Sequence, residues 1–199
     1  MHVLMIGAAG MVGRKILDKV AAEPEALGAA IDKLTLVDVV KPAAPAQLAA
    51  VATGEAVDLS EAGVAERLIA GRPDLIIHLA AVVSGEAEAD FDKGYRVNQT
   101  GTHALLEAIR HEGMKQPYKP RVVYASSIAV YGAPFAETIA EDFALYPLTS
   151  YGTQKAIGEL LLADYSRKGF LSGIGIRLPT ICIRPGTPNK AASGFFSNI

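Results

Sequence analysis

The chain has 199 residues, of which 50% are hydrophobic and 20% are charged, and its formal net charge is −2. This length and hydrophobic content are sufficient for one compact domain with a buried core. A balanced charge without a basic run argues against binding to nucleic acid or to a membrane surface. No apolar run reaches the roughly 18 to 20 residues that are needed to span a bilayer.

The single cysteine, Cys182, has no partner for an internal disulfide, and the opening residues MHVLMIGAAG lack the charged start of a signal peptide. We therefore expect a protein of the reducing cytoplasm. The four histidines have no companion ligands at suitable spacing, so no metal site is expected. His78 is interpreted as a packed strand residue rather than a ligand.

Short apolar segments alternate with longer segments of helical period along the chain. The expected strands are Val3–Ile6, Leu34–Val39, Leu75–His78, Val122–Ala125 and Ile174–Leu178, and the expected helices are Met11–Ala22, Glu61–Ala70, Tyr95–Glu112 and Ser150–Lys168. Lys41–Gly54 is expected to be a loop with one short strand near Val51. Continuous apolar strands imply burial on both faces, so this order predicts an α/β fold: a doubly wound parallel sheet of the Rossmann type.

A glycine-rich turn follows the first expected strand and opens the first expected helix. Gly7, Gly10 and Gly13 in GAAGMVG leave bare backbone, which lets a dinucleotide pyrophosphate approach the positive end of the helix. An ordinary tight strand-to-helix turn is the alternative reading of the glycines alone. The remaining cofactor contacts expected at this turn are Ala9, Met11 and Val12.

Acidic and small residues end the next strands, at the edge where ligands of such sheets bind. Asp38 ends the second strand, where its carboxylate can accept hydrogen bonds from the adenosine ribose and repel a 2′-phosphate, which favours NAD over NADP. Lys41 lies nearby in the sequence, so NADP is not excluded as the cofactor. Asp58 is expected either to meet the adenine amino group or to cap a helix. The other expected cofactor contacts at this edge are Leu59, Leu79, Ala80 and Ala81.

Tyr151 and Lys155 lie four residues apart in YGTQK, which puts both side chains on one face of a helix. A phenol with an ordinary pKa near 10 becomes a usable base when an adjacent ammonium favours its phenolate. Tyr151 is therefore expected to exchange a proton with a substrate hydroxyl while a nicotinamide exchanges hydride with the adjacent carbon. Ser126 and Ser127 follow the fifth strand, and Ser127 is expected to hold the reacting oxygen, although either serine alone is also typical of a loop cap.

These motifs, together with HLAA, the RVNQTGT segment and the IRLP strand, resemble the extended short-chain dehydrogenases, which include UDP-glucose 4-epimerases. The resemblance implies that Asn98 orders the active-site helix and a proton-relay water, and that Pro179 and Thr180 flank the nicotinamide. It implies a homodimer formed through the helices that carry Asn98 and Tyr151. It also implies a C-terminal substrate domain, so residues 1–180 are expected to be the NAD-binding domain and 181–199 the start of a truncated substrate-binding region.

The residues at and after these motifs help to choose among the reactions of the family. The dehydratases of the family carry Thr-Asp-Glu where this chain has Ser127, Ile128 and Ala129, so dehydration is disfavoured. Nucleotide-sugar epimerases usually carry Arg-x-x-Asn after the sixth strand, to hold the nucleotide sugar. This chain has Arg177, Leu178, Pro179 and Thr180 there, so the asparagine is replaced by threonine. The first residues and IRPGTPNKAASGF resemble dehydrogenases that oxidise D-erythronate, a small sugar acid, with NAD.

Sugar-acid oxidation is therefore the predicted activity, a UDP-sugar 4-epimerase is the alternative, and a non-catalytic NAD-binding module is the third reading. The residues expected near the substrate, for which surface roles are equally open, are Ser84, Arg184, Asn189 and Lys190.

Overall fold

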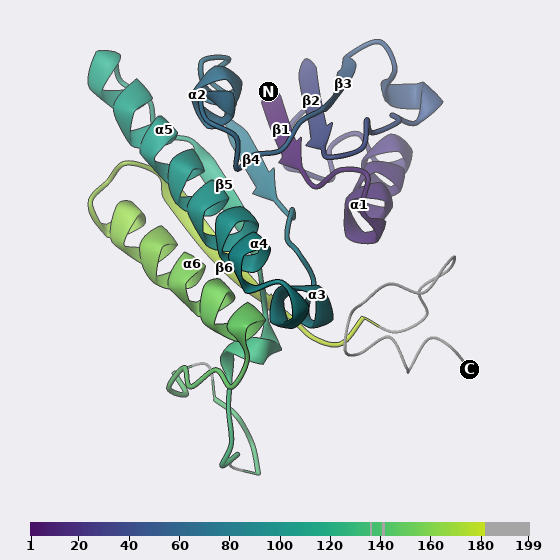
Figure 1. Cartoon of the computed structure of the whole chain (residues 1–199). Helices are drawn as coiled ribbons and strands as arrows, with labels where there is room; N and C mark the ends of the chain where they lie inside the picture. Colours follow the sequence, from purple (N-terminus) through teal and green to yellow (C-terminus); the bar gives the residue numbers. More distant parts are fainter. Residues whose placement is uncertain (136, 141, 182–199) are drawn as a thin grey trace.

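The computed structural model describes residues 1–135, 137–140 and 142–181 (Figure 1). Its sheet contains six parallel strands in the order β3-β2-β1-β4-β5-β6. The strands are β1 (His2–Ile6), β2 (Lys33–Asp38), β3 (Ala52–Ala56), β4 (Leu75–His78), β5 (Arg121–Ser127) and β6 (Ser172–Leu178). The predicted doubly wound parallel sheet is confirmed, and the short strand expected near Val51 is β3.

Helices cover both faces of this sheet. The helices are α1 (Met11–Ala22), α2 (Val64–Ile69), α3 (Ser84–Ala89), α4 (Phe91–Gly94), α5 (Gly101–Lys115) and α6 (Ser150–Arg167); the single turns are η1 (Ala46–Leu48), the π-helical η2 (Tyr95–Thr100) and η3 (Ile128–Val130). The helix expected over Glu61–Ala70 begins three residues later, and α3 and α4 were not expected. None of the helices in the described ranges is both long enough and apolar enough to pass through a membrane.

The alternation of side chains along β1 explains the two buried clusters. Leu4 and Ile6 pack into one cluster with residues of α2, α5 and α6, and Val3 and Met5 pack into the other with Leu17 of α1. Successive strand residues point to opposite faces, so the central strands must be apolar throughout. In Figure 1, α5 and α6 lie side by side over one face and α1 lies on the other.

The expectation of burial on both faces is wrong for β6. This strand pairs with β5 alone among the described residues, and Ile174 and Ile176 are 59% and 45% exposed. An edge strand has a neighbour on one side only, so its apolar residues are not necessarily covered.

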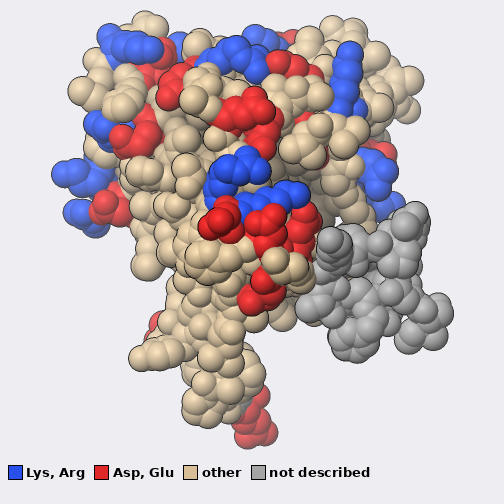
Figure 2. Space-filling view, viewed as in Figure 1, with Lys and Arg blue, Asp and Glu red and all other residues tan. Residues whose placement is uncertain are grey.

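Charged side chains of opposite sign lie next to one another on the face drawn in Figure 2. The ion pairs of the structure include Lys93 with Glu86 and Arg96 with Asp58.

Candidate active site

The glycine turn lies against the end of β4. Gly7 has φ +89°, and a Cβ added to it would lie 2.5 Å from the nitrogen of Ala80. Leu79 and Ala80 each donate a backbone hydrogen bond to the carbonyl of Ile6, at 2.8 and 3.1 Å. Only glycine combines this backbone conformation with this approach, so a side chain at position 7 would push the turn away from residues 79–80.

The N-terminus of α1 has no side-chain cap among the residues that the structure describes. Gly10 is its N-cap and provides no side-chain hydrogen bond, so the first amides of the helix are not capped from within. Gly13 lies in the first turn, where a Cβ would lie 2.6 Å from the carbonyl oxygen of Gly7. Ala9, Met11 and Val12 are half-buried around this turn. The bare amides and the helix dipole together form a cradle suited to a phosphate group.

Asp38 reaches the same turn from the end of β2. Its carboxylate accepts hydrogen bonds from the backbone nitrogens of Ala9, at 2.9 Å, and Val39, at 2.7 Å. The side chain is half-buried. The structure thus brings a carboxylate to the edge of the glycine turn.

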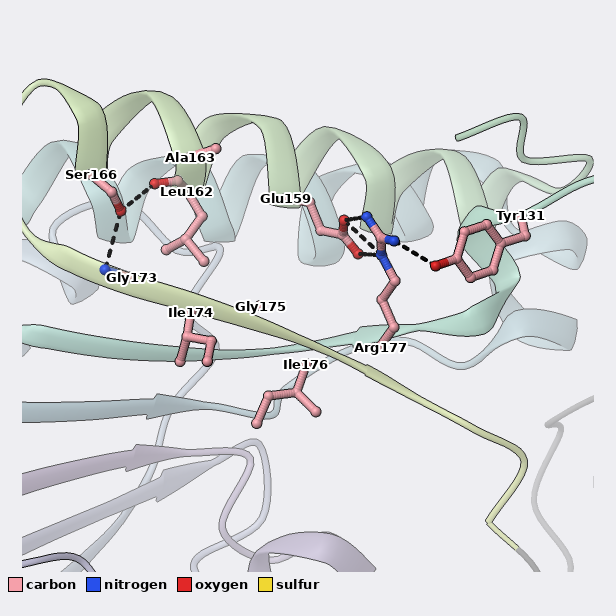
Figure 3. A pocket seen from close by; sticks show the side chains of 10 residues that line it. All are labelled: Tyr131, Glu159, Leu162, Ala163, Ser166, Gly173, Ile174, Gly175, Ile176 and Arg177. Carbon is pink, nitrogen blue, oxygen red and sulfur yellow. Dashed lines mark hydrogen bonds and ion pairs between the residues drawn. The ribbon is translucent and has the colours of Figure 1, made fainter. Parts of the chain in front are cut away.

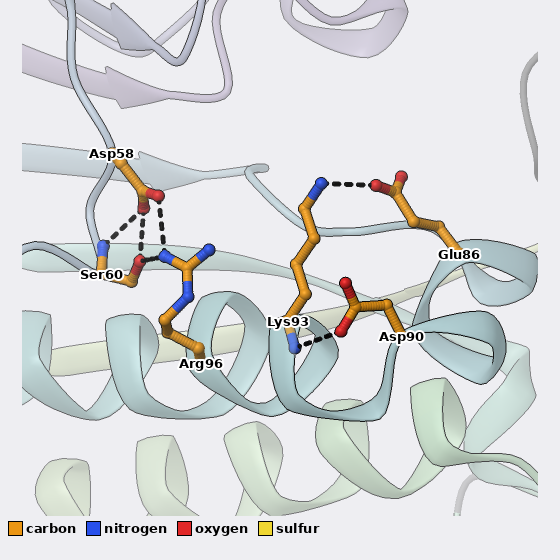
Figure 4. A network of polar contacts seen from close by, with 6 residues as sticks. All are labelled: Asp58, Ser60, Glu86, Asp90, Lys93 and Arg96. Atoms are coloured by element: carbon orange, nitrogen blue, oxygen red, sulfur yellow. Dashed lines mark hydrogen bonds and ion pairs between the residues drawn. The ribbon is translucent and has the colours of Figure 1, made fainter.

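Asp58 lies in the loop after β3, and the expectation that it caps a helix is wrong, since the N-cap of α2 is Gly63. Its carboxylate accepts hydrogen bonds from the backbone and hydroxyl of Ser60 and, at 3.0 Å, from Arg96 of η2 (Figure 4). Burial opposes ionisation, but these hydrogen bonds outweigh it and lower the pKa of Asp58. The side chain of the next residue, Leu59, is part of the hydrophobic core.

Asn98 is buried in η2 and joins two parts of the site. Its side chain accepts a hydrogen bond from the nitrogen of Val82 at 2.7 Å and donates one to the carbonyl of Val82 at 3.0 Å. It also donates a hydrogen bond to Gln154 of α6 at 2.7 Å. Asn98 therefore connects the loop after β4 to the helix that carries Tyr151 and Lys155.

Tyr151 lies in the first turn of α6. Thr149 caps this helix by accepting a hydrogen bond from the nitrogen of Gly152 at 3.0 Å. A Cβ on Gly152 would overlap the carbonyl oxygen of Ala129 in η3. This close approach places the first turn of α6 directly against the turn that follows Ser127.

Lys155 is buried beneath Tyr151, one helical turn away. Its ammonium donates a hydrogen bond to the carbonyl of Ala125 at 2.7 Å, and it lies 4.7 Å from the ring centre of Tyr124 and 5.8 Å from that of Tyr151. Burial lowers the pKa of Lys155 to about 7. A lysine that titrates near neutrality next to a phenol is suited to tune a proton-transfer site.

The two serines at the end of β5 have different partners. Ser126 is buried and donates a hydrogen bond to Glu159 of α6. Ser127 is half-buried and caps η3, because its hydroxyl oxygen accepts a hydrogen bond from the nitrogen of Ala129 at 3.2 Å. An oxygen that accepts this bond still has its own proton to donate, so capping does not conflict with holding a substrate oxygen.

Two further predicted positions follow β6. Pro179 is exposed and Thr180 is half-buried, directly beyond the carboxyl end of that strand. Ala81 and Ser84 follow β4, and both are half-buried. The remaining predicted residues, Cys182, Arg184, Asn189 and Lys190, lie outside the described residues.

His78 is packed, as the sequence predicted. It is buried at the end of β4, its Nε2 lies 2.9 Å from the hydroxyl of Thr102, and its ring centre lies 5.6 Å from that of Tyr124. Burial, with a smaller contribution from the charge of Lys155, lowers the pKa of His78 to about 3. The ring is therefore neutral at physiological pH. The described part of the chain contains no group of three or more His, Cys, Asp or Glu residues arranged to hold a metal.

Sequence reasoning missed four residues that support the site, namely Tyr131, Gln154, Glu159 and Arg177. Glu159 follows Lys155 by four residues, and this spacing was the available signal for a third side chain on the same helix face. The partners of the others come from distant segments, and no local pattern identifies them.

Comparison with known proteins identifies the family to which this fold and these motifs belong. A model of the NAD dependent epimerase/dehydratase family matches residues 3–199. Two D-erythronate dehydrogenases, from Cupriavidus necator and Haemophilus influenzae, are 48% and 45% identical to this chain, covering all of it and 61% of each relative. A crystal structure described as the nucleoside-diphosphate-sugar epimerase from Agrobacterium tumefaciens matches with TM-score 0.95 and 61% identity, covering 100% of this chain and 58% of that one.

The chain belongs to the NAD dependent epimerase/dehydratase family. It spans about 61% of the length of the curated relatives it matches.

Proposed function

We propose that this chain is the NAD-binding and proton-transfer part of a dehydrogenase that oxidises a hydroxyl of a small sugar acid such as D-erythronate. The observation that carries the proposal is Lys155, a buried lysine held between the end of β5 and the ring of Tyr151. Burying an ammonium costs free energy, so packing alone does not explain a lysine at this position.

The residues around the glycine turn fit a dinucleotide. The uncapped start of α1 and the bare backbone at Gly7 and Gly10 fit a pyrophosphate, and Asp38 offers a carboxylate for ribose hydroxyls. The carboxylate of Asp58 already accepts hydrogen bonds from Ser60 and Arg96, so an adenine amino group would share it with them. Bound NAD would supply the hydride acceptor.

Tyr151 would take the proton of the substrate hydroxyl, and Ser127 would donate a hydrogen bond to the oxygen on which negative charge develops. Lys155 would favour the phenolate of Tyr151 through its charge. Asn98 would keep α6 in place through Gln154. Residues 181–199 would be the start of a substrate-binding region. The carboxylate of the sugar acid would be contacted there by Arg184, Asn189 and Lys190.

A nucleotide-sugar epimerase is the second candidate, since the matching structure from Agrobacterium tumefaciens carries that description at 61% identity. An epimerase returns hydride to the same substrate, so it does not accumulate NADH. The sugar-acid reading is preferred because the two curated relatives at 48% and 45% identity carry that name.

The deciding experiment incubates the full-length protein with NAD and a panel of sugar acids and UDP-sugars, and follows NADH absorbance and product stereochemistry. Accumulation of NADH with D-erythronate supports the dehydrogenase. Net epimerisation of a UDP-sugar without NADH supports the second candidate. NAD binding with neither reaction would leave the non-catalytic module as the correct reading.

We also propose a cytoplasmic homodimer formed through α6, which carries Tyr151, and through the helical segment of η2 and α5, which carries Asn98 in η2. Leu160 is 65% exposed on α6, and a large apolar side chain at that position is suited to an interface. Light scattering should give twice the protomer mass for the full-length protein, and Leu160→Glu should shift it to the monomer. Val40, which is 67% exposed after β2, provides the control: Val40→Glu should leave the mass unchanged.

A further inference from the structure

Three side chains follow one another at intervals of four residues along one face of α6. Tyr151 and Lys155 belong to the proposed proton-transfer site, and Glu159 is the third. Its side chain is 13% exposed, so its contacts are largely shielded from water. An acidic residue in this position needs partners, and the structure provides them from two strands.

Glu159 binds Arg177 of β6 through a two-pronged ion pair. Nε of Arg177 lies 3.0 Å from Oε1, and Nη2 lies 2.8 Å from Oε2 (Figure 3). The same carboxylate accepts the hydrogen bond from the hydroxyl of Ser126. Ser126 and Arg177 are register partners in neighbouring strands, so one helix side chain ties both strand ends together.

Arg177 continues the chain of contacts to Tyr131. Its Nη1 lies 2.5 Å from the phenol oxygen, and its guanidinium carbon lies 5.0 Å from the ring centre. Figure 3 shows these side chains meeting at one end of a pocket of about 610 Å³ between α6 and β6. Tyr131 follows η3, the turn that Ser127 caps.

The contacts therefore hold the chain on both sides of Ser127. Ser126 precedes it directly and Tyr131 follows it by four residues, and each is bonded to a member of the ion pair. Two-pronged bonds between arginine and carboxylate fix orientation as well as distance, which a lysine does not reproduce. A displacement of about 1 Å at a reacting group lowers a rate by up to about 100-fold.

We propose that Glu159 and Arg177 are positioning residues that hold Ser127 against the first turn of α6, where Tyr151 lies. This inference rests on the proposed function for its kinetic consequence. Its structural consequence, a fixed backbone from Ser127 to Tyr131, does not depend on which substrate is used.

The test uses the full-length protein with Glu159→Gln and Arg177→Lys. With NAD and D-erythronate, kcat should fall at least 10-fold in each variant, while KM for NAD changes less than 2-fold. The deuterium isotope effect on kcat should rise, because misplacement slows the chemical step. In the absence of any ligand, hydrogen exchange of the amides from Ser127 to Tyr131 should be at least 10-fold faster in each variant than in the wild type.

Glu112, near the C-terminal end of α5, provides a matched control. It pairs with Arg72, their side chains are 10% and 27% exposed, and Arg72 lies 4.7 Å from the ring centre of Tyr118. Glu112→Gln should lower the melting temperature without changing kcat or the exchange of residues 127–131.

The outcomes separate this inference from the proposed function. Unchanged exchange in Glu159→Gln overturns the positioning role whatever the substrate is. A kcat within 2-fold of wild type, in a protein whose Tyr151→Phe variant is inactive, overturns it as well. If Tyr151→Phe keeps its turnover, the proposed function fails, and the exchange measurement still decides the positioning role.

Discussion

The ammonium of Lys155 donates a hydrogen bond to the carbonyl of Ala125, 2.7 Å away, and this bond ties the helix of Tyr151 to the strand that ends at Ser127. The contact joins residues 30 positions apart. One donor of the ammonium is thereby used at the strand, while its charge remains one helical turn from Tyr151. The same burial that permits this contact lowers the pKa of Lys155 to about 7.

Replacing Tyr151 with Phe should lower kcat at least 100-fold in the full-length protein, because general acid-base groups contribute roughly 100- to 10,000-fold. The affinity for NAD, measured by titration calorimetry, should change less than about 3-fold, since the ring remains. Turnover at the wild-type rate would show that another group moves the proton.

Replacing Lys155 with Met should make stability less dependent on pH. The folded-state pKa of Lys155 is lowered to about 7, below its ordinary value near 10.4, so the unfolded chain binds more protons between these values. Wild-type stability should therefore rise with pH in this window relative to the variant, by up to about 1.4 kcal/mol per pKa unit.

Urea unfolding of both proteins at pH 7 and pH 9.5 measures this difference. The free energy of unfolding of Lys155→Met minus that of wild type should be larger at pH 7. An equal difference at both pH values would mean that Lys155 is not buried as described.

Replacing Asp38 with Ala should weaken NAD binding by about 10-fold and reduce discrimination against NADP. The carboxylate lies at the glycine turn, where it is placed to accept from a ribose and to repel a 2′-phosphate. Kd values for both cofactors provide the measurement, and Asp32→Ala, at an exposed position before β2, is the control. An undiminished preference for NAD in Asp38→Ala would remove Asp38 from cofactor selection.

Replacing Gly152 with Ala should destabilise the protein by roughly 1 to 3 kcal/mol, the usual cost of overpacking, because the new Cβ would overlap the carbonyl oxygen of Ala129. It should also lower kcat, since α6 must move away from η3. Gly101→Ala is the control for stability, because a Cβ there would lie 3.5 Å from its nearest neighbour, the nitrogen of Ser60. Melting temperatures compare the two, and equal effects would contradict the close approach.

Local patterns predicted most of the fold. The helix that begins at Met11 and the strand over Leu75–His78 have the predicted bounds. Apolar periodicity and the glycine turn depend only on residues that are neighbours in the sequence. The short helices over Ser84–Ala89 and Phe91–Gly94 were missed, since segments of six and four residues carry too few positions for a helical period.

The sequence by itself determined the parallel α/β fold, the glycine turn and the placement of Tyr151 and Lys155 on one helix face, since each depends on spacing within a single segment. The tertiary structure alone decided which groups these residues meet. The sequence did not contain the partners of Ser126 and Ser127: one donates to Glu159 and the other caps η3. The burial and the partners of a side chain arise where distant segments pack. They set the pKa of Lys155, and this pKa cannot be predicted from spacing along the chain.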